Sequence, residues 1–269
     1  MTDRIRKNRI NGRDVAWRHN ALPAGEGAPA LVLLHGAGGS SLDWPQEWLD
    51  DAGAFGHLPV FALDLPGHGA SDGPGIADVA TLAQKVEEFT QHLGLRDVCL
   101  VGHSMGALIA LATALRAHAP VTRLILIAGA ARFEVHPALF DSLKQDFDKT
   151  VHKIAGACWH DSAAETLRTG TENAMRAAGL GVLLNDFGVC DRADLMDDLA
   201  DLAIPVLAIA ASEDRLVRLQ IMQQMCERIK GCHLEIVPDA GHFVHLEKRP
   251  EVERMIAAFL DRPGAPHLP

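Results

Sequence analysis

Short apolar runs, each bounded by Gly, Pro or Asp, alternate along the chain with stretches of helical periodicity. The apolar runs are predicted strands at Leu31–Leu34, Leu58–Leu63, Val98–Val101, Leu124–Ala128, Pro205–Ala210 and Leu234–Val237. Helices are predicted at Val79–Leu93, Ala107–Ala117, Leu219–Ile229 and Glu251–Leu260. Strands that alternate with helices form βαβ units, so the pattern predicts an α/β fold whose central sheet is mostly parallel and buried on both faces.

The N-terminal segment follows a different pattern. Ile5–Ile10 and Val15–His19 are short segments separated by Asn11-Gly12. An Asn-Gly pair favours the tight type I′ turn of a hairpin. We therefore expect an antiparallel hairpin at one edge of the sheet.

A third pattern occupies residues 132–200. Long helical stretches, such as PALFDSLKQDFDKTVHKIAGA and SAAETLRTGTENAMRAAGL, follow one another there without a strand pattern between them. Because they fall between two predicted strands, we expect a helical cap inserted above the carboxyl edge of the sheet, where open α/β sheets bind ligands. The predicted organisation is a core of residues 1–131 and 201–269 with a cap of residues 132–200.

Composition narrows the class of function. The chain has 269 residues, of which 48% are hydrophobic and 22% charged, as in ordinary globular proteins. Its net charge is −10, which argues against a general affinity for nucleic acid or anionic membranes and favours small-molecule chemistry. The N-terminus has no apolar signal-peptide core, and no apolar run reaches the roughly 18 residues of a membrane helix. A cytoplasmic location is expected, and monomer and homodimer both remain open.

Cysteine and histidine usage argues against disulfides and metal sites. The five cysteines are odd in number and form no CxxC pair, so reduced thiols are expected. The 14 histidines include no HExxH motif or paired metal-ligand spacing. Neither a metal nor another cofactor is predicted.

The segment Gly102-His103-Ser104-Met105-Gly106 carries the first chemical signal. It follows a predicted strand and begins a helix, which is the context of a GxSxG nucleophile elbow. The flanking glycines leave room for the sharp turn that exposes the serine. Because a serine hydroxyl is a weak nucleophile alone, Ser104 needs a base and an orienting acid elsewhere in the chain.

Two later loops provide that base and that acid. Asp214 follows the predicted strand Pro205–Ala210, and His242 follows the last predicted strand. The chain order of serine, acid and histidine matches the order that this architecture imposes. Glu213 and His245 are the neighbouring alternatives for the acid and the base.

The loop His35-Gly36-Ala37-Gly38-Gly39-Ser40 is rich in small residues and follows the first predicted parallel strand. Its backbone N–H groups are free to face a bound oxygen. We expect the N–H groups of Ala37 and Met105 to form an oxyanion hole. His35 is expected to support this loop, Asp64 to brace a neighbouring loop, and His103 to pack.

Together these segments resemble the α/β-hydrolase fold superfamily, in its single-domain form with a helical cap. The resemblance rests on LVLLHGAGGS, LDLPGHGAS, VGHSMG, ASEDRLV and PDAGHFVHLEKRPE, and it spans most of residues 29–131 and 204–260. It implies a cofactor-free serine hydrolase similar to small carboxylesterases, including pimeloyl-carrier-protein methyl esterases and enol-lactonases. Carbon–carbon hydrolases of aromatic catabolism are also similar, but they often carry a proline where Gly39 stands. An ester substrate is therefore favoured.

The cap carries no assignable motif, so it leaves the substrate open. The cap residues that could line an acyl pocket are Trp159, His160, Phe187 and Cys190, with Trp159 and Phe187 as the main candidates; aromatic residues at helical spacing also fit an ordinary core. The basic cap residues fit either a docking surface for an acidic carrier protein or a solvated helix face; they are Lys144, Lys149, Lys153, Arg168 and Arg176. The alternatives to an esterase are a carbon–carbon hydrolase and a non-catalytic small-molecule receptor, which would not need a complete triad.

Overall fold

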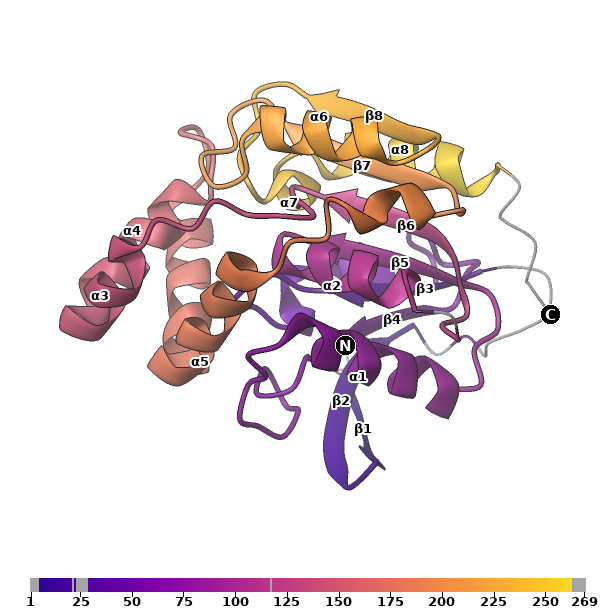
Figure 1. The fold of residues 1–269 in the computed structure, drawn as a ribbon, viewed down its shortest axis with the longest axis horizontal. Helices are drawn as coiled ribbons and strands as arrows, with labels where there is room; N and C mark the ends of the chain where they lie inside the picture. The colour runs from indigo at the N-terminus through magenta and orange to yellow at the C-terminus, as the bar shows by residue number, and fades with distance from the viewer. Residues whose placement is uncertain (1–4, 21, 23–28, 117, 263–269) are drawn as a thin grey trace.

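The computed structural model describes residues 5–20, 22, 29–116 and 118–262 (Figure 1). The described residues form a sheet of eight strands in the spatial order β1-β2-β4-β3-β5-β6-β7-β8. The strands are β1 Ile5–Ile10, β2 Arg13–His19, β3 Ala30–Leu34, β4 Val60–Leu63, β5 Val98–His103, β6 Val121–Ile127, β7 Val206–Ala211 and β8 Cys232–Val237. Strands β3 to β8 pair in parallel, which confirms the predicted α/β fold.

The N-terminal hairpin is also confirmed. β1 pairs antiparallel with β2, and β2 pairs antiparallel with β4, so the hairpin forms one edge of the sheet. Asn11 and Gly12 have φ angles of 46° and 84°. Both values are positive, as a type I′ turn requires, so the turn type explains why the hairpin forms at this Asn-Gly pair.

Helices cover both faces of the sheet and extend beyond one end of it. They are α1 Val79–His92, α2 Met105–Ala114, α3 Ala138–Gln145, α4 Phe147–Ala157, α5 Glu165–Arg192, α6 Leu219–Arg228, α7 Val244–Glu247 and α8 Arg249–Leu260. Val32 and Leu34 pack in the apolar cluster that includes α1, α2 and α6. Leu31 and Leu33 pack in the cluster that includes α8. This alternation shows that both faces of β3 are buried, as parallel strands require.

Helix α2 begins earlier than the sequence pattern predicted. Its first residue is Met105, directly after Ser104, rather than Ala107. Ser104 itself has the positive φ of a sharp turn, so the chain passes from strand to helix within one residue. The predicted end of this helix, residue 117, lies outside the described residues.

Helices α3, α4 and α5 lie in the chain between β6 and β7 and project to one side of the sheet (Figure 1). They share an apolar cluster that includes Leu143, Val151 and Leu183. Phe243 of the core also belongs to this cluster, so apolar packing continues from the helices into the sheet domain. The division into a core and a cap at residues 132 and 200 stays a prediction. None of the helices in the described ranges has the length and apolar character that spanning a membrane requires.

Candidate active site

Ser104 occupies a strained turn between β5 and α2. Its φ and ψ angles are 55° and −120°, a region that non-glycine residues rarely adopt. A Cβ atom on Gly102 would lie 2.3 Å from the Gly106 oxygen, and one on Gly106 would lie 2.0 Å from the Leu34 oxygen. The flanking glycines are therefore required by close backbone approach, as the GxSxG pattern predicted. Such strain costs on the order of 1–3 kcal/mol and is characteristic of functional sites.

Asp214 and His242 lie together, as predicted. Nδ1 of His242 is 2.8 Å from Oδ2 of Asp214, and both side chains are nearly fully buried. Oδ1 of Asp214 accepts the N–H groups of Leu216 and Val217 at 2.8 and 2.9 Å. A carboxylate held this way accepts a proton-bearing Nδ1, so Nε2 of His242 is the nitrogen available to a substrate or to Ser104.

Ser104 and His242 line one cavity. Across the described residues, no hydrogen bond joins the two side chains. Catalytic hydrogen bonds are often long before substrate binds. The arrangement therefore places the predicted nucleophile and base at a shared cavity without fixing their final contact.

The two alternatives that the sequence left open lie elsewhere. Glu213 is exposed, and its backbone N–H donates to the Ala240 oxygen. His245 is fully buried, and its Nε2 donates to the Asp43 oxygen at 3.1 Å. Burial lowers the pKa of His245 to about 3. His245 is thus held neutral as a structural donor.

The small-residue loop after β3 is held by its own histidine. Nδ1 of His35 donates to the Gly36 oxygen at 2.8 Å, and its Nε2 accepts the Leu65 N–H at 3.1 Å. Burial lowers the pKa of His35 to about 3, which agrees with a neutral ring. The Gly36 oxygen also accepts the Gly39 N–H at 3.2 Å. Because N–H and C=O of one peptide point in opposite directions, these bonds fix the direction of the Ala37 N–H.

Ala37 lines the cavity beside Ser104, whereas the Met105 side chain is fully buried. Met105 is not among the residues that line the cavity, and it follows Ser104 directly as the first residue of α2. The N–H groups of Ala37 and Met105 stay the predicted oxyanion hole. Asp64 connects the surrounding loops, because it accepts the Ser41 N–H at 2.7 Å and the Ala70 N–H at 2.9 Å.

His103 supports the backbone of the predicted base. Its Nε2 donates to the His242 oxygen at 3.0 Å, and its ring packs 4.9 Å from that of Phe243. Burial lowers the pKa of His103 well below its ordinary value, so the ring is neutral. The sequence indicated only packing for this residue, because nothing local predicts a bond to a residue 139 positions away.

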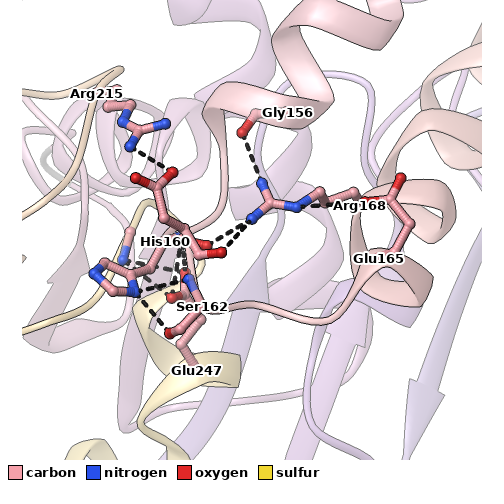
Figure 2. Close-up of polar contacts among 9 residues, drawn as sticks. Gly156, His160, Ser162, Glu165, Arg168, Arg215 and Glu247 are labelled. Atoms are coloured by element: carbon pink, nitrogen blue, oxygen red, sulfur yellow. Dashed lines mark hydrogen bonds and ion pairs between the residues drawn. The ribbon is translucent and has the colours of Figure 1, made fainter.

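Glu247 is a site residue that the sequence reasoning missed. Figure 2 shows its carboxylate beside His160, which lies in the connection between α4 and α5. It accepts the Gly241 N–H at 3.1 Å and the His160 N–H at 3.3 Å. Burial raises the pKa of Glu247. The predicted cap and the loop of the predicted base therefore share one carboxylate.

Two arginines complete this contact (Figure 2). Arg168 donates to the His160 oxygen at 2.7 Å and to the Gly156 oxygen at 3.0 Å. Arg215, the residue after Asp214, pairs with Asp161 at 2.7 Å. Arg168 is therefore engaged within α4 and α5 and their connection, which accounts for one of the basic residues that the sequence left open.

The cavity has a volume of about 290 Å³ and mostly apolar walls. Residues from the segment 132–200 that line it are Phe133, Glu134, Val135, His136, Leu139, Ile154, Cys158, Met175, Phe187 and Cys190. Asp43 also lines the cavity, and burial raises the pKa of its carboxyl to about 6. Phe187 and Cys190 are thus placed at the cavity, as the sequence suggested.

Trp159 is not part of the cavity wall. Its ring stacks on Phe243 with centroids 4.8 Å apart, and its Nε1 donates to Thr171 at 3.0 Å. Phe243 stands between Trp159 and the cavity and lines it instead. His160 is also absent from the lining. Within the described ranges, His, Cys, Asp and Glu side chains form no group of three or more suited to a metal ion.

Comparison with known proteins assigns the class. The model of the alpha/beta hydrolase family matches residues 31–254, which is most of the chain, so the protein belongs to this family.

Particular relatives and structures refine this assignment. A pimeloyl-acyl-carrier protein methyl ester esterase of Pectobacterium carotovorum subsp. carotovorum (strain PC1) is 28% identical over 259 residues, covering 87% of this chain and 95% of that protein. The dihydrolipoyllysine-residue acetyltransferase component of the acetoin cleaving system of Pseudomonas putida is 29% identical over 273 residues, covering 94% of this chain and 68% of that protein. A solved thermophilic esterase has a TM-score of 0.81 and 25% identity, covering 95% of this chain and 96% of the other.

Proposed function

We propose that the protein is a serine hydrolase that cleaves a small carboxylic ester through an acyl-enzyme intermediate on Ser104. One observation carries the proposal: Ser104, on its strained turn, lines the same cavity as His242, whose Nδ1 lies 2.8 Å from a buried carboxylate of Asp214. The similarity to a methyl ester esterase and to a solved esterase structure also supports an ester as the substrate.

In the first half of the reaction, Nε2 of His242 takes the proton of the Ser104 hydroxyl as its oxygen attacks the ester carbon. Negative charge develops on the carbonyl oxygen, and the N–H groups of Ala37 and Met105 stabilise it. Asp214 stabilises the imidazolium and keeps its orientation. The imidazolium then gives its proton to the leaving alcohol, and the acyl group stays on Ser104.

In the second half, a water molecule takes the place of the alcohol. His242 accepts a proton from this water as it attacks the acyl carbon, and the proton returns to the Ser104 oxygen when the acid leaves. The proposed mechanism uses no cofactor or metal. Every proton is transferred by His242.

The cavity supports a small and mainly apolar acyl group. Its volume of about 290 Å³ lies just below the roughly 300–1,000 Å³ typical of ligand pockets. The net charge of −10 favours a small molecule over a nucleic acid or a membrane as the partner, and the cytoplasm is the proposed location. Docking of an acidic carrier protein stays an open proposal.

The test uses p-nitrophenyl acetate, butyrate and octanoate with the wild-type protein and Ser104→Ala. We expect turnover by the wild type, loss of turnover in the variant, and an acetyl adduct on the Ser104 peptide after acid quench and mass spectrometry. Turnover of a vinylogous diketone without ester hydrolysis would support the carbon–carbon hydrolase instead. Tight ligand binding without turnover of either class would support a receptor.

A further inference from the structure

A buried carboxylate on helix α5 contacts the loop that follows β3. Asp186 is 1% exposed, and its Oδ2 accepts the Gly38 N–H at 2.8 Å across 148 positions of sequence. The same oxygen lies 2.8 Å from Nε2 of His68. The helix lies beside the segment between β4 and α1 (Figure 1), where Asn185 and Arg192 also donate to backbone oxygens. Asp186 therefore belongs to the contact between the predicted cap and the core.

His68 completes a buried ion pair with Asp186. Its Nε2 donates to the carboxylate and its Nδ1 lies 3.2 Å from the Pro66 oxygen, so both ring nitrogens face acceptors. Burial alone would lower the pKa of His68, but the hydrogen bond and the charge of Asp186 raise it. A charged carboxylate forms shorter and stronger bonds to N–H donors than a neutral group does. The Gly38 N–H is thus held by a strong acceptor.

The Gly38 contact is one peptide away from the predicted oxyanion donor. Gly38 has a φ of +66°, and a Cβ atom there would lie 2.5 Å from Leu183 of the same helix. The preceding peptide is fixed on its other side, because the Gly36 oxygen accepts bonds from within the core. Core contacts thus hold one end of the Gly36–Ala37–Gly38 segment, and Asp186 holds the other.

We infer that Asp186 is a positioning residue for the oxyanion hole: it holds the Ala37–Gly38 peptide from helix α5, so that stabilisation of the oxyanion depends on how this helix is seated. The inference rests on the proposed function, because the oxyanion hole is part of that function. Asp186 does not touch the reacting atoms. Its effect is transmitted through the backbone of the loop.

Positioning and simple structural support predict different kinetics. Support alone changes stability and the fraction of active protein, and leaves kcat per active site unchanged. Positioning changes an interaction made only in the transition state, so kcat falls while KM is nearly constant. The neighbouring Asn185 provides a matched control, because its Nδ2 donates to the Gly75 oxygen at 3.2 Å and does not contact Gly38.

Three variants at Asp186 separate the effect of the hydrogen-bond acceptor from the effects of its charge and of its packing. Asp186→Ala removes the acceptor, whereas Asp186→Asn keeps an oxygen for the Gly38 N–H and removes the charge. Removing one partner of a buried ion pair is often strongly destabilising, but replacing both partners by apolar residues of similar volume is often tolerated. Asp186→Leu combined with His68→Leu therefore removes the acceptor while keeping the packing, and it replaces the alanine variant if that variant does not fold.

The experiment measures kcat and KM for p-nitrophenyl acetate after titration of active sites, together with hydrogen exchange of the peptide covering residues 35–41. We expect Asp186→Ala and the double leucine variant to lower kcat by about 10- to 100-fold with KM within about threefold. Asp186→Asn, which keeps the acceptor, should have a kcat within about threefold of the wild-type value, and Asn185→Ala should match the wild type in kcat. Exchange of the loop should accelerate only where the acceptor is lost.

Failure of the inference and failure of the proposed function give different results. If the wild type hydrolyses esters through Ser104 and the acceptor-free variants match Asn185→Ala in kcat and exchange, the inference is wrong and the function stands. If the wild type hydrolyses no ester, the function fails. The inference then fails with it, because a positioning role requires an oxyanion hole that acts in catalysis; faster exchange of the loop in the acceptor-free variants would then show structural support alone.

Discussion

Nδ1 of His242 lies 2.8 Å from Oδ2 of Asp214, although the two residues are 28 positions apart and follow different strands. The other carboxylate oxygen accepts two backbone N–H groups, from Leu216 and Val217. The carboxylate therefore cannot rotate without losing hydrogen bonds. This holds the imidazole with Nε2 on the side opposite the acid.

Asp214→Asn should inactivate the protein through the histidine tautomer. The amides of Leu216 and Val217 require an oxygen at Oδ1, so the new NH₂ group of Asn would face Nδ1 of His242 and place the ring proton on Nε2. The analogous change in a serine protease lowers kcat by about 10⁴-fold, and we expect a loss of that order for aryl-ester hydrolysis. The exposed neighbour Glu213→Gln is the matched control. A loss smaller than about tenfold in Asp214→Asn would contradict the assigned role.

Substitutions at Ser104 should separate chemistry from strain. Ser104→Ala and Ser104→Gly should both lower kcat by up to about a millionfold, because both remove the proposed nucleophile. Glycine tolerates a φ of 55° without strain, so Ser104→Gly should unfold at a higher urea concentration than Ser104→Ala, by about 1 kcal/mol or more in free energy. Glycine ordinarily destabilises relative to alanine. An alanine variant as stable as the glycine variant would show that the turn is not strained.

The buried His245 should make stability depend on pH below neutrality. Burial lowers its pKa to about 3 in the folded state, whereas an unfolded histidine titrates near 6.5. Between these values only the unfolded state binds the proton. The contribution to the free energy of unfolding is therefore fully present above about pH 6.5 and is lost as the pH falls toward 3, by about 1.4 kcal/mol per pH unit.

The measurement is urea denaturation of the wild type and His245→Gln between pH 7 and 4.5. Glutamine keeps an N–H donor for the Asp43 oxygen and does not titrate. The slope of the free energy of unfolding against pH should be smaller in the variant, by the amount that corresponds to the uptake of about one proton on unfolding. Parallel curves for the two proteins would mean that His245 carries the same charge in both states.

Phe187 and Trp159 should respond differently to replacement by alanine. Phe187 lines the cavity, so Phe187→Ala should shift preference from acetyl toward octanoyl esters by about tenfold or more in kcat/KM. Trp159 packs behind Phe243, so Trp159→Ala should instead lower stability by about 3–5 kcal/mol with a smaller change in preference. Preference is measured with the three aryl esters, and stability by urea denaturation. An unchanged preference in folded Phe187→Ala would place acyl selection elsewhere in the cavity.

Local sequence patterns were enough to predict the fold and the contacts that are made within short segments. The turn at Asn11-Gly12 and the elbow around Ser104 can each be predicted from adjacent residues. In both, glycine adopts a backbone conformation or a close backbone approach that a larger residue would not allow. The parallel sheet follows from the alternation of apolar strands and amphipathic helices. Asp214 and His242 follow from their places after strands, since parallel strands bring such loops to one edge of the sheet.

Contacts between distant segments could not be predicted in this way. Asp186 meets Gly38 and His68 only because helix α5 contacts the loop after β3 and the segment between β4 and α1, and nothing in its local sequence distinguishes it from other helix carboxylates. Glu247 is similar, because its partners lie on two separate loops. Trp159 was assigned to the pocket from residue type alone. Its true place depends on Phe243, which tertiary packing sets between it and the cavity.

Two further imidazoles lie close to the ring of His242, and they bear on where the proton of the proposed mechanism can go. The ring centroid of His103 lies 4.7 Å from that of His242 and 4.6 Å from that of His245. Burial lowers the pKa of both neighbours, and both already donate Nε2–H to backbone oxygens. In the proposed mechanism, a proton taken from Ser104 would therefore find no second imidazole that can hold it. It would stay on His242 until the leaving alcohol accepts it, so the neighbouring histidines would keep the proton in place and would not pass it on.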